Sequence, residues 1–288
     1  MTITIDETSH DQRGEAEAGG RRRSVRRIAR LSGFYVPLVL AAVMTVLFLP
    51  ELLATLVTGW TAEGAAELGV HRLHVMGIAA VVATFLVGLF AQAYKPRRRV
   101  AAMWGALLTI AIVSAGTVYY GVGRPEEVLP FLLVTGVAFV FHPAGRALFK
   151  RGETYSPLLF ALVAIAVIPV LAFVATQMSL TTDLTDPHAV DGHYVMMIGL
   201  VLAPLAYGIV AAMGFAGWRL AAWLAAFPMA FYGVMSVAFP MQVGSTGLVW
   251  GVGAILWAIA FIAVAEYSRF GSSQYVRRPS RQSGIATE

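Results

Sequence analysis

Residues 156–179 read SPLLFALVAIAVIPVLAFVATQMS, an unbroken apolar stretch without a charged side chain. A helix needs roughly 20 such residues to cross the hydrocarbon core of a bilayer. The stretch is continuously apolar rather than alternating, and an open strand cannot satisfy its backbone hydrogen bonds in lipid. It therefore predicts a membrane-spanning helix.

Seven further stretches of the same kind occur along the chain. Several contain proline or glycine, which membrane helices tolerate. The eight predicted spans are 34–56, 70–94, 101–122, 127–149, 156–179, 193–215, 219–240 and 246–268. The predicted fold class is therefore all-α, a polytopic transmembrane helix bundle of about eight spans that occupies residues 34–268.

The composition agrees with this prediction. Of the 288 residues, 58% are hydrophobic and 13% are charged, and the mean hydropathy is +0.72. Soluble domains carry about 25% charged residues, so the lipid bilayer is the first expected partner. The chain has no cysteine, which excludes disulfides, thiolate metal sites, iron–sulfur clusters and cysteine nucleophiles.

The basic residues predict the orientation. With the N-terminus inside, the inner segments hold 19 of the 21 Lys and Arg residues, and the outer side holds only Arg72 and Arg124. This bias predicts a multi-pass protein of the cell membrane with both termini in the cytoplasm. Residues 1–33 and 269–288 are polar and predicted to form disordered basic tails. We interpret the N-terminal arginines as an anchor beside anionic lipid. No nucleic-acid partner is expected, and protein partners are unknown.

The candidate chemistry lies in histidines near the predicted outer face. His71 and His74 open the second span, where positions i and i+3 place their Cβ atoms about 5–6 Å apart on one helix face. His188 and His193 flank the start of the sixth span. If the two helix starts are neighbours, the four imidazoles share one pocket.

Two carboxylates are predicted to support this cluster. Asp191 lies in the loop before His193, and Glu51 follows Pro50 near the outer end of the first span. Imidazole and carboxylate ligands suit zinc, iron, manganese or copper(II). Three interpretations stay open: a bound metal or haem, pH sensing or proton relay, and interfacial histidines beside solvated acids.

His142 lies apart from this cluster. It falls in the inner half of the fourth span and precedes Pro143, whose ring is expected to kink the helix. A histidine at this depth either hydrogen-bonds a neighbouring helix or binds a cofactor such as haem. Both interpretations stay open.

Other classes of membrane protein are disfavoured. The spans contain no Asp, Glu, Lys or Arg near their midpoints, whereas ion-coupled carriers usually keep one there. Lys95 and Lys150 both fall at inner boundaries, so a retinal Schiff base is excluded. Phosphate-binding glycine loops are also absent.

The His71-Arg72 pair opening an outer-facing helix, with Glu63 and Glu67 before it, resembles haem A synthase. In that family an outer histidine with a nearby glutamate takes part in handling haem. The family also carries haem-ligating histidines in its fourth and eighth spans. Here the eighth span has no histidine, and the fourth has only His142, near the opposite face.

Two functional hypotheses follow. The first is a protein that binds a transition metal ion or haem through the outer histidines, with an oxidoreductase as one form of this hypothesis. The second is a non-catalytic protein, either a transporter or channel for a small uncharged solute or an accessory membrane subunit. Substrate, reaction and oligomeric state are not predicted.

Overall fold

The computed structural model describes residues 8–152, 154–270 and 276–277, with side chains described from residue 24 to residue 268 except 153. Within this part the chain is almost entirely helical. The elements in chain order are α1 (Thr8–Phe48), α2 (Pro50–Thr58), α3 (Ala62–Leu68), η1 (Gly69–His71), α4 (Arg72–Phe90), η2 (Ala91–Ala93), η3 (Pro96–Arg98), α5 (Val100–Tyr120), α6 (Pro125–Val140), η4 (Gly145–Phe149), β1 (Thr154–Tyr155), α7 (Pro157–Thr181), α8 (Pro187–Val190), α9 (His193–Ala212), α10 (Trp218–Ala238), α11 (Gly247–Phe270) and β2 (Val276–Arg277).

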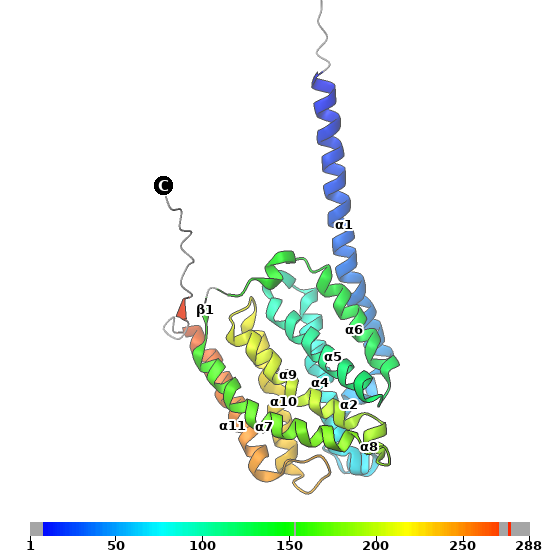
Figure 1. The fold of residues 1–288 in the computed structure, drawn as a ribbon, viewed down its shortest axis with the longest axis vertical. Coiled ribbons are helices and arrows are strands. Elements are labelled where there is room, and N and C mark those ends of the chain that lie inside the picture. Colours follow the sequence, from blue (N-terminus) through cyan, green and yellow to red (C-terminus); the bar gives the residue numbers. More distant parts are fainter. Residues whose placement is uncertain (1–7, 153, 271–275, 278–288) are drawn as a thin grey trace, which may run out of the picture.

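The long helices form a bundle (Figure 1). Among the described residues, seven helices are long and apolar enough to cross a membrane. They are α1 from Ser24, the continuous stretch from α3 to η2, and α5, α7, α9, α10 and α11. The predicted all-α polytopic fold is confirmed.

Proline interrupts two of the eight predicted spans. The stretch 34–56 is divided, because α1 ends at Phe48 and α2 begins at Pro50. In the stretch 127–149, α6 is only 16 residues long and ends at Val140, three residues before Pro143. A proline cannot donate the helical hydrogen bond, and it disfavours helix at the residue before it. Because α6 is shorter than a typical span, eight passes stay a prediction.

Helix α9 is the centre of the bundle. Its apolar segment is 83% buried, whereas those of α7 and α11 are 22% and 28% buried. Helix α9 packs against α4, α5, α7 and α10. The outer helices instead present side chains such as Ile168 and Val249 on the surface, as expected for helices in contact with lipid.

Close packing around α9 depends on small residues facing Tyr207. The Tyr207 side chain is fully buried, and its hydroxyl donates to the carbonyl oxygen of Thr84 at 3.4 Å. A Cβ atom at Gly105 would lie 2.0 Å from the Tyr207 ring, and one at Gly88 would lie 2.2 Å from its hydroxyl. The two glycines therefore let α4 and α5 approach the ring closely.

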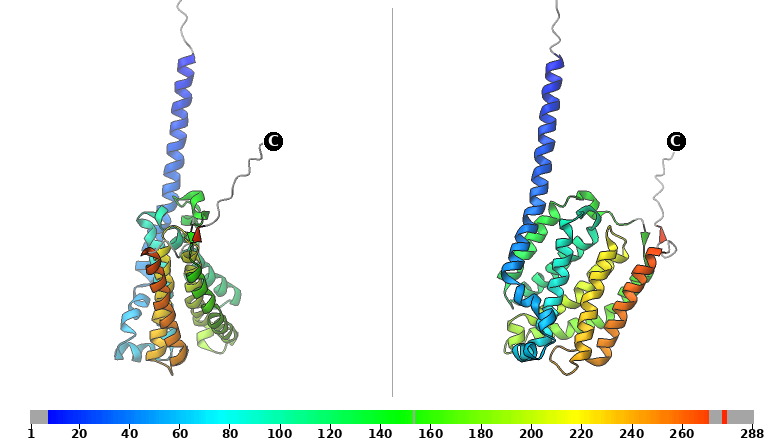
Figure 2. Two further views of the ribbon diagram at one scale, coloured as in Figure 1. Left: turned by 90° about the vertical axis from the view of Figure 1, so that its left-hand side faces the viewer. Right: turned by 180° about the vertical axis from the view of Figure 1, so that it is seen from behind.

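The loops gather at two ends of the bundle. At one end the Arg30 side chain donates to the carbonyl oxygen of His142, and the Arg97 side chain donates to that of Pro143. At the other end the Gly123 amide donates to the Val190 carbonyl oxygen. The N-terminal part of α1 and the C-terminal end of α11 both lie at the first end, and α8 lies at the second (Figures 1 and 2). This grouping agrees with the prediction that the basic inner segments lie on one side and the outer loops on the other. The orientation in the membrane stays a prediction.

The structure describes most of the first predicted disordered tail and little of the second. Helix α1 already begins at Thr8, within the segment 1–33. Residues 1–7 and most of the tail 269–288 lie outside the described residues. The disorder of both tails stays a prediction.

The Tyr207 contact predicts that Gly105→Ala destabilises the protein by about 1–3 kcal/mol, because the added methyl group overlaps the buried ring. The matched control is Gly253→Ala in α11, where an added Cβ meets nothing within 4 Å. Thermal unfolding in detergent measures both variants. Equal midpoints for the two variants would contradict this account of the packing.

Candidate metal centre

Two neighbouring helix starts bring the histidines together. His71 ends η1 and His74 lies in the first turn of α4, while His193 is the first residue of α9. Helices α4 and α9 pack along each other, and their apolar residues share one core cluster. Because the two helices begin at the same end of the bundle, their first turns lie side by side (Figure 1).

The short helix α8 adds the fourth histidine. Asp186 caps α8 by accepting a hydrogen bond from the His188 amide at 2.9 Å, and Pro187 occupies the first helical position. Gly192 then adopts a φ of 72°, which favours glycine. A Cβ on Gly192 would lie 2.9 Å from the Cα of Gly123, so this turn sits tightly on the loop between α5 and α6.

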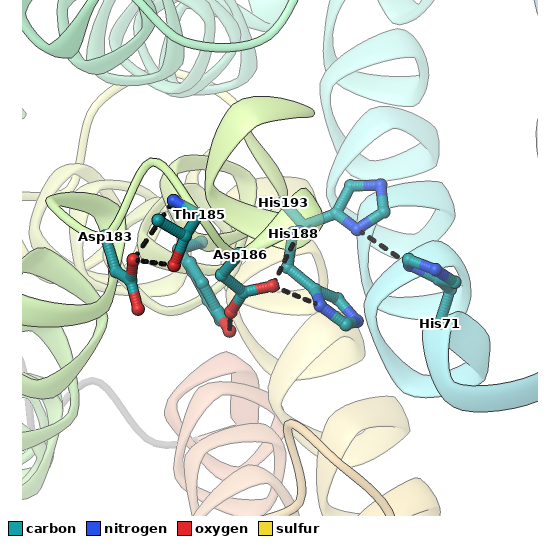
Figure 3. Close-up of polar contacts among 7 residues, drawn as sticks. His71, Asp183, Thr185, Asp186, His188 and His193 are labelled. Atoms are coloured by element: carbon teal, nitrogen blue, oxygen red, sulfur yellow. Dashed lines mark hydrogen bonds and ion pairs between the residues drawn. The ribbon is translucent and has the colours of Figure 1, made fainter.

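Three imidazoles form the candidate centre, and Figure 3 shows their rings facing one another. One possible ligand nitrogen from each of His71, His188 and His193 lies within 4.8 Å of those of the other two. The Nδ1 atoms of His71 and His193 are 3.4 Å apart, a separation longer than most protein hydrogen bonds. The ring centroids of His71 and His188 are 4.3 Å apart in a stacked arrangement.

A carboxylate orients His188. The Asp186 side chain accepts from His188 Nδ1 at 2.9 Å (Figure 3), and it also accepts from the Tyr194 hydroxyl. The hydrogen bond from Tyr194 and, to a lesser extent, those from His188 lower the pKa of Asp186 to about 2. This carboxyl group therefore stays ionised at neutral pH. With Nδ1 acting as the donor, His188 Nε2 carries the lone pair. That nitrogen is buried and has no hydrogen-bond partner within the described chain.

His74 lies directly beside the three imidazoles. Its side chain is fully buried, and its ring centroid is 4.9 Å from that of His188 and 5.7 Å from that of His193. Neither ring nitrogen has a hydrogen-bond partner among the described residues. Its Nε2 faces Gly244, where an added Cβ would approach it to 2.9 Å.

Arg72 is the first residue of α4 and anchors the start of this helix, between His71 and His74 in the sequence. Its guanidinium donates to the Gly59 carbonyl oxygen at 2.6 Å and lies 3.8 Å from the centre of the Phe239 ring. The positive charge therefore interacts with the α2–α3 corner and the α10–α11 loop. These contacts of Arg72 thereby fix the position of the backbone that carries His71 and His74.

The two predicted supporting carboxylates do not join the three imidazoles. Asp191 and Glu51 are both exposed, and the ligand group found among the described residues contains neither of them. Instead Asp186, another acid of the same loop, and Tyr194 orient His188, a role that the sequence did not assign to them. The Asp186-Pro187 pair was the available signal, because Asp followed by Pro is typical of a helix start.

His142 lies at the opposite end of the bundle in a satisfied hydrogen-bond network. Its Nε2 lies 3.2 Å from the Gln92 side-chain oxygen, and its Nδ1 accepts from the Ala144 amide at 3.1 Å. The Gln92 amide nitrogen donates in turn to the carbonyl oxygens of Gly88 and Arg99. Both ring nitrogens of His142 are therefore engaged by the protein, which favours the structural interpretation over a cofactor ligand.

Comparisons with protein-family models, with curated proteins and with solved structures found no significant match.

The network around His142 predicts that His142→Ala lowers the free energy of unfolding by about 1–3 kcal/mol, because Gln92 and the Ala144 amide lose their partner. The absorption spectrum of the purified protein should not change. A Soret band that disappears in this variant would instead identify His142 as a haem ligand. Thermal unfolding and a visible spectrum on the same sample distinguish the two outcomes.

Proposed function

We propose that the protein binds one first-row transition metal ion through His71, His188 and His193, at the non-cytoplasmic edge of the cell membrane. The observation that carries the proposal is the convergence of three imidazole nitrogens within 4.8 Å of one another.

The spacing of the nitrogens fits a metal ion better than a hydrogen bond. An imidazole nitrogen lies about 2.0–2.1 Å from a bound zinc ion, so two such nitrogens on a tetrahedral ion are about 3.3–3.4 Å apart. The Nδ1 atoms of His71 and His193 are 3.4 Å apart. Since His71 stacks on His188, coordination should turn the His71 ring slightly out of this stack.

The unpaired nitrogens support the same conclusion. Leaving a buried polar group without a hydrogen bond costs about 1–3 kcal/mol. His188 Nε2 and both ring nitrogens of His74 are buried without a partner in the described part of the chain. A metal ion at His188 Nε2 removes one of these costs. The Asp186 carboxylate then acts as the outer partner that metal-binding histidines commonly have.

The three imidazole donors also narrow the choice of metal ion or cofactor. Imidazole ligands without thiolates suit zinc, copper, iron or nickel. Three protein ligands leave a coordination position open for water or a substrate, as in catalytic zinc sites. His74 lies beside His188 and His193 and supplies a further imidazole for hydrogen bonding. A haem fits less well, because nitrogens this close together leave no room for a porphyrin ring between them.

Metal analysis of the purified chain tests the proposal. We expect about one transition metal ion per chain from metal-replete cells, and little metal in His71→Ala, His188→Ala or His193→Ala. His74→Ala should retain the ion, because His74 lies outside the three-histidine group. Because ligand imidazoles must be neutral, the ion should also be released on acidification. Cobalt(II) titration provides a spectroscopic measure of the same site.

The matched control is His142→Ala, which removes a buried histidine far from the centre and should leave the metal content unchanged. Wild-type protein without bound metal that also fails to bind cobalt(II) would contradict the proposal. That outcome would favour the non-catalytic alternative, a solute transporter, channel or accessory subunit.

The orienting carboxylate gives a second prediction. Asp186→Asn keeps an oxygen that can cap α8 but loses the charge that holds His188 Nδ1, so the metal affinity should fall about 10–100-fold. Asp183→Asn is the control. Asp183 lies in the same loop and accepts from Thr185 at 2.6 and 3.0 Å (Figure 3). Competitive titration with a metal indicator compares the two variants, and equal affinities would refute the role of Asp186.

A further inference from the structure

A cavity of about 560 Å³ opens beside the candidate centre, and His193 forms part of its wall. The cavity lies between α2, α4, α5, α6 and the first turn of α9. Its volume is in the usual range for sites that bind small molecules. His71, His74 and His188 do not line it, so His193 connects the cavity to the imidazole cluster.

The cavity extends along the helices. On α5 its lining runs from Thr117 to Thr109, and on α4 from Ile78 to Phe85. At 1.5 Å per residue, these stretches span about 10–12 Å parallel to the helix axes. The cavity therefore reaches from the loops at the histidine end toward the middle of the bundle.

The polarity of the wall changes along this length. At the loop end the lining includes Arg124, Glu127 and Asp191 together with His193. The deeper lining consists mainly of apolar side chains. These are Val81, Val82, Phe85, Ile110, Val113 and Phe131. Thr109 adds no free donor at depth, because its hydroxyl donates to the Gly105 carbonyl oxygen of its own helix at 2.8 Å.

We infer that this cavity binds a single-chain amphiphile, with its hydrocarbon chain in the apolar part and its oxygen-bearing head group beside His193. The inference rests on the proposed function, because it assigns a substrate class to the metal centre. A water-soluble polar substrate would leave its polar groups unpaired against the deep walls. A hydrocarbon chain instead gains contact there, and its head group meets the charged mouth.

A second cavity is larger but less suited to this role. It measures about 720 Å³ between α7, α10 and α11, and none of the three proposed ligands lines it. Tyr194 does line it, but the Tyr194 hydroxyl donates to Asp186. The hydrogen-bonded side chains of Tyr194 and Asp186 therefore separate a molecule bound there from the proposed metal ion. The second cavity serves as an internal reference for the experiment.

Photolabelling of the full-length protein in detergent tests the inference. The probe is hexadecanol with a diazirine near the end of its chain, and mass spectrometry locates the adducts. Adducts are expected on the α4, α5 and α6 residues that line the first cavity, and excess unlabelled hexadecanol should suppress them. Adducts confined to the second cavity or scattered over lipid-facing residues such as Ile168 would overturn the inference.

Matched tryptophan variants test whether the cavity itself is required. Ile78→Trp fills the cavity from α4 and should reduce the labelling at least about tenfold, which corresponds to about 1.4 kcal/mol. Leu52→Trp fills it from α2 and provides a second variant if the first does not fold. Ile168→Trp on the surface of α7, at a residue 77% exposed, is the control and should label normally. Undiminished labelling in a folded cavity variant would overturn the inference.

Metal content measured on the same samples separates this inference from the proposed function. Ile78→Trp should keep its metal while it loses the label, because Ile78 contacts the cavity and is not a ligand. His193→Ala should lose its metal and keep the label in the apolar part. Absence of metal from the wild type would refute the metal centre, whereas absence of specific labelling in metal-loaded protein would refute only the amphiphile.

Discussion

The packing of α4 against α9 is the contact on which the candidate site depends. The two helices approach closely at Gly77, where an added Cβ would lie 3.0 Å from the Met197 sulfur atom. Moving either helix by one residue would shift its first turn by 1.5 Å and rotate it by about 100°. His71 and His193 would then no longer face each other. The tight contact between the helices therefore sets the imidazole geometry several residues away.

The sequence predicted the fold well because the bilayer imposes a simple rule. A long apolar stretch has to satisfy its backbone internally, so seven of the predicted spans appear as long helices, with α1 ending early at Phe48, before Pro50. The exception is the stretch 127–149. Hydropathy averages over a window and does not detect that Pro143 ends α6 after 16 residues. The sequence therefore identified the helical class more reliably than the number of crossings.

The site was predictable in part. The positions of four histidines near two helix starts could be read from the sequence, but their approach could not, because His71 and His193 are 122 residues apart. The choice of carboxylate also depended on local geometry. Asp186 and Asp191 both flank α8, yet only Asp186 is the N-cap, and its side chain contacts His188. Composition alone treats these two acids as equivalent.

The two histidine environments in this chain provide an internal comparison. His142 and His74 are both fully buried, so both lose the hydrogen bonds that water would supply. The fold provides His142 with partners at both ring nitrogens. It provides His74 and His188 Nε2 with none among the described residues. The protein therefore satisfies a buried imidazole at one end of its bundle. At the other end, among the described residues, it leaves His74 and His188 Nε2 without partners beside His71 and His193. The metal ion proposed above would accept the lone pair of His188 Nε2.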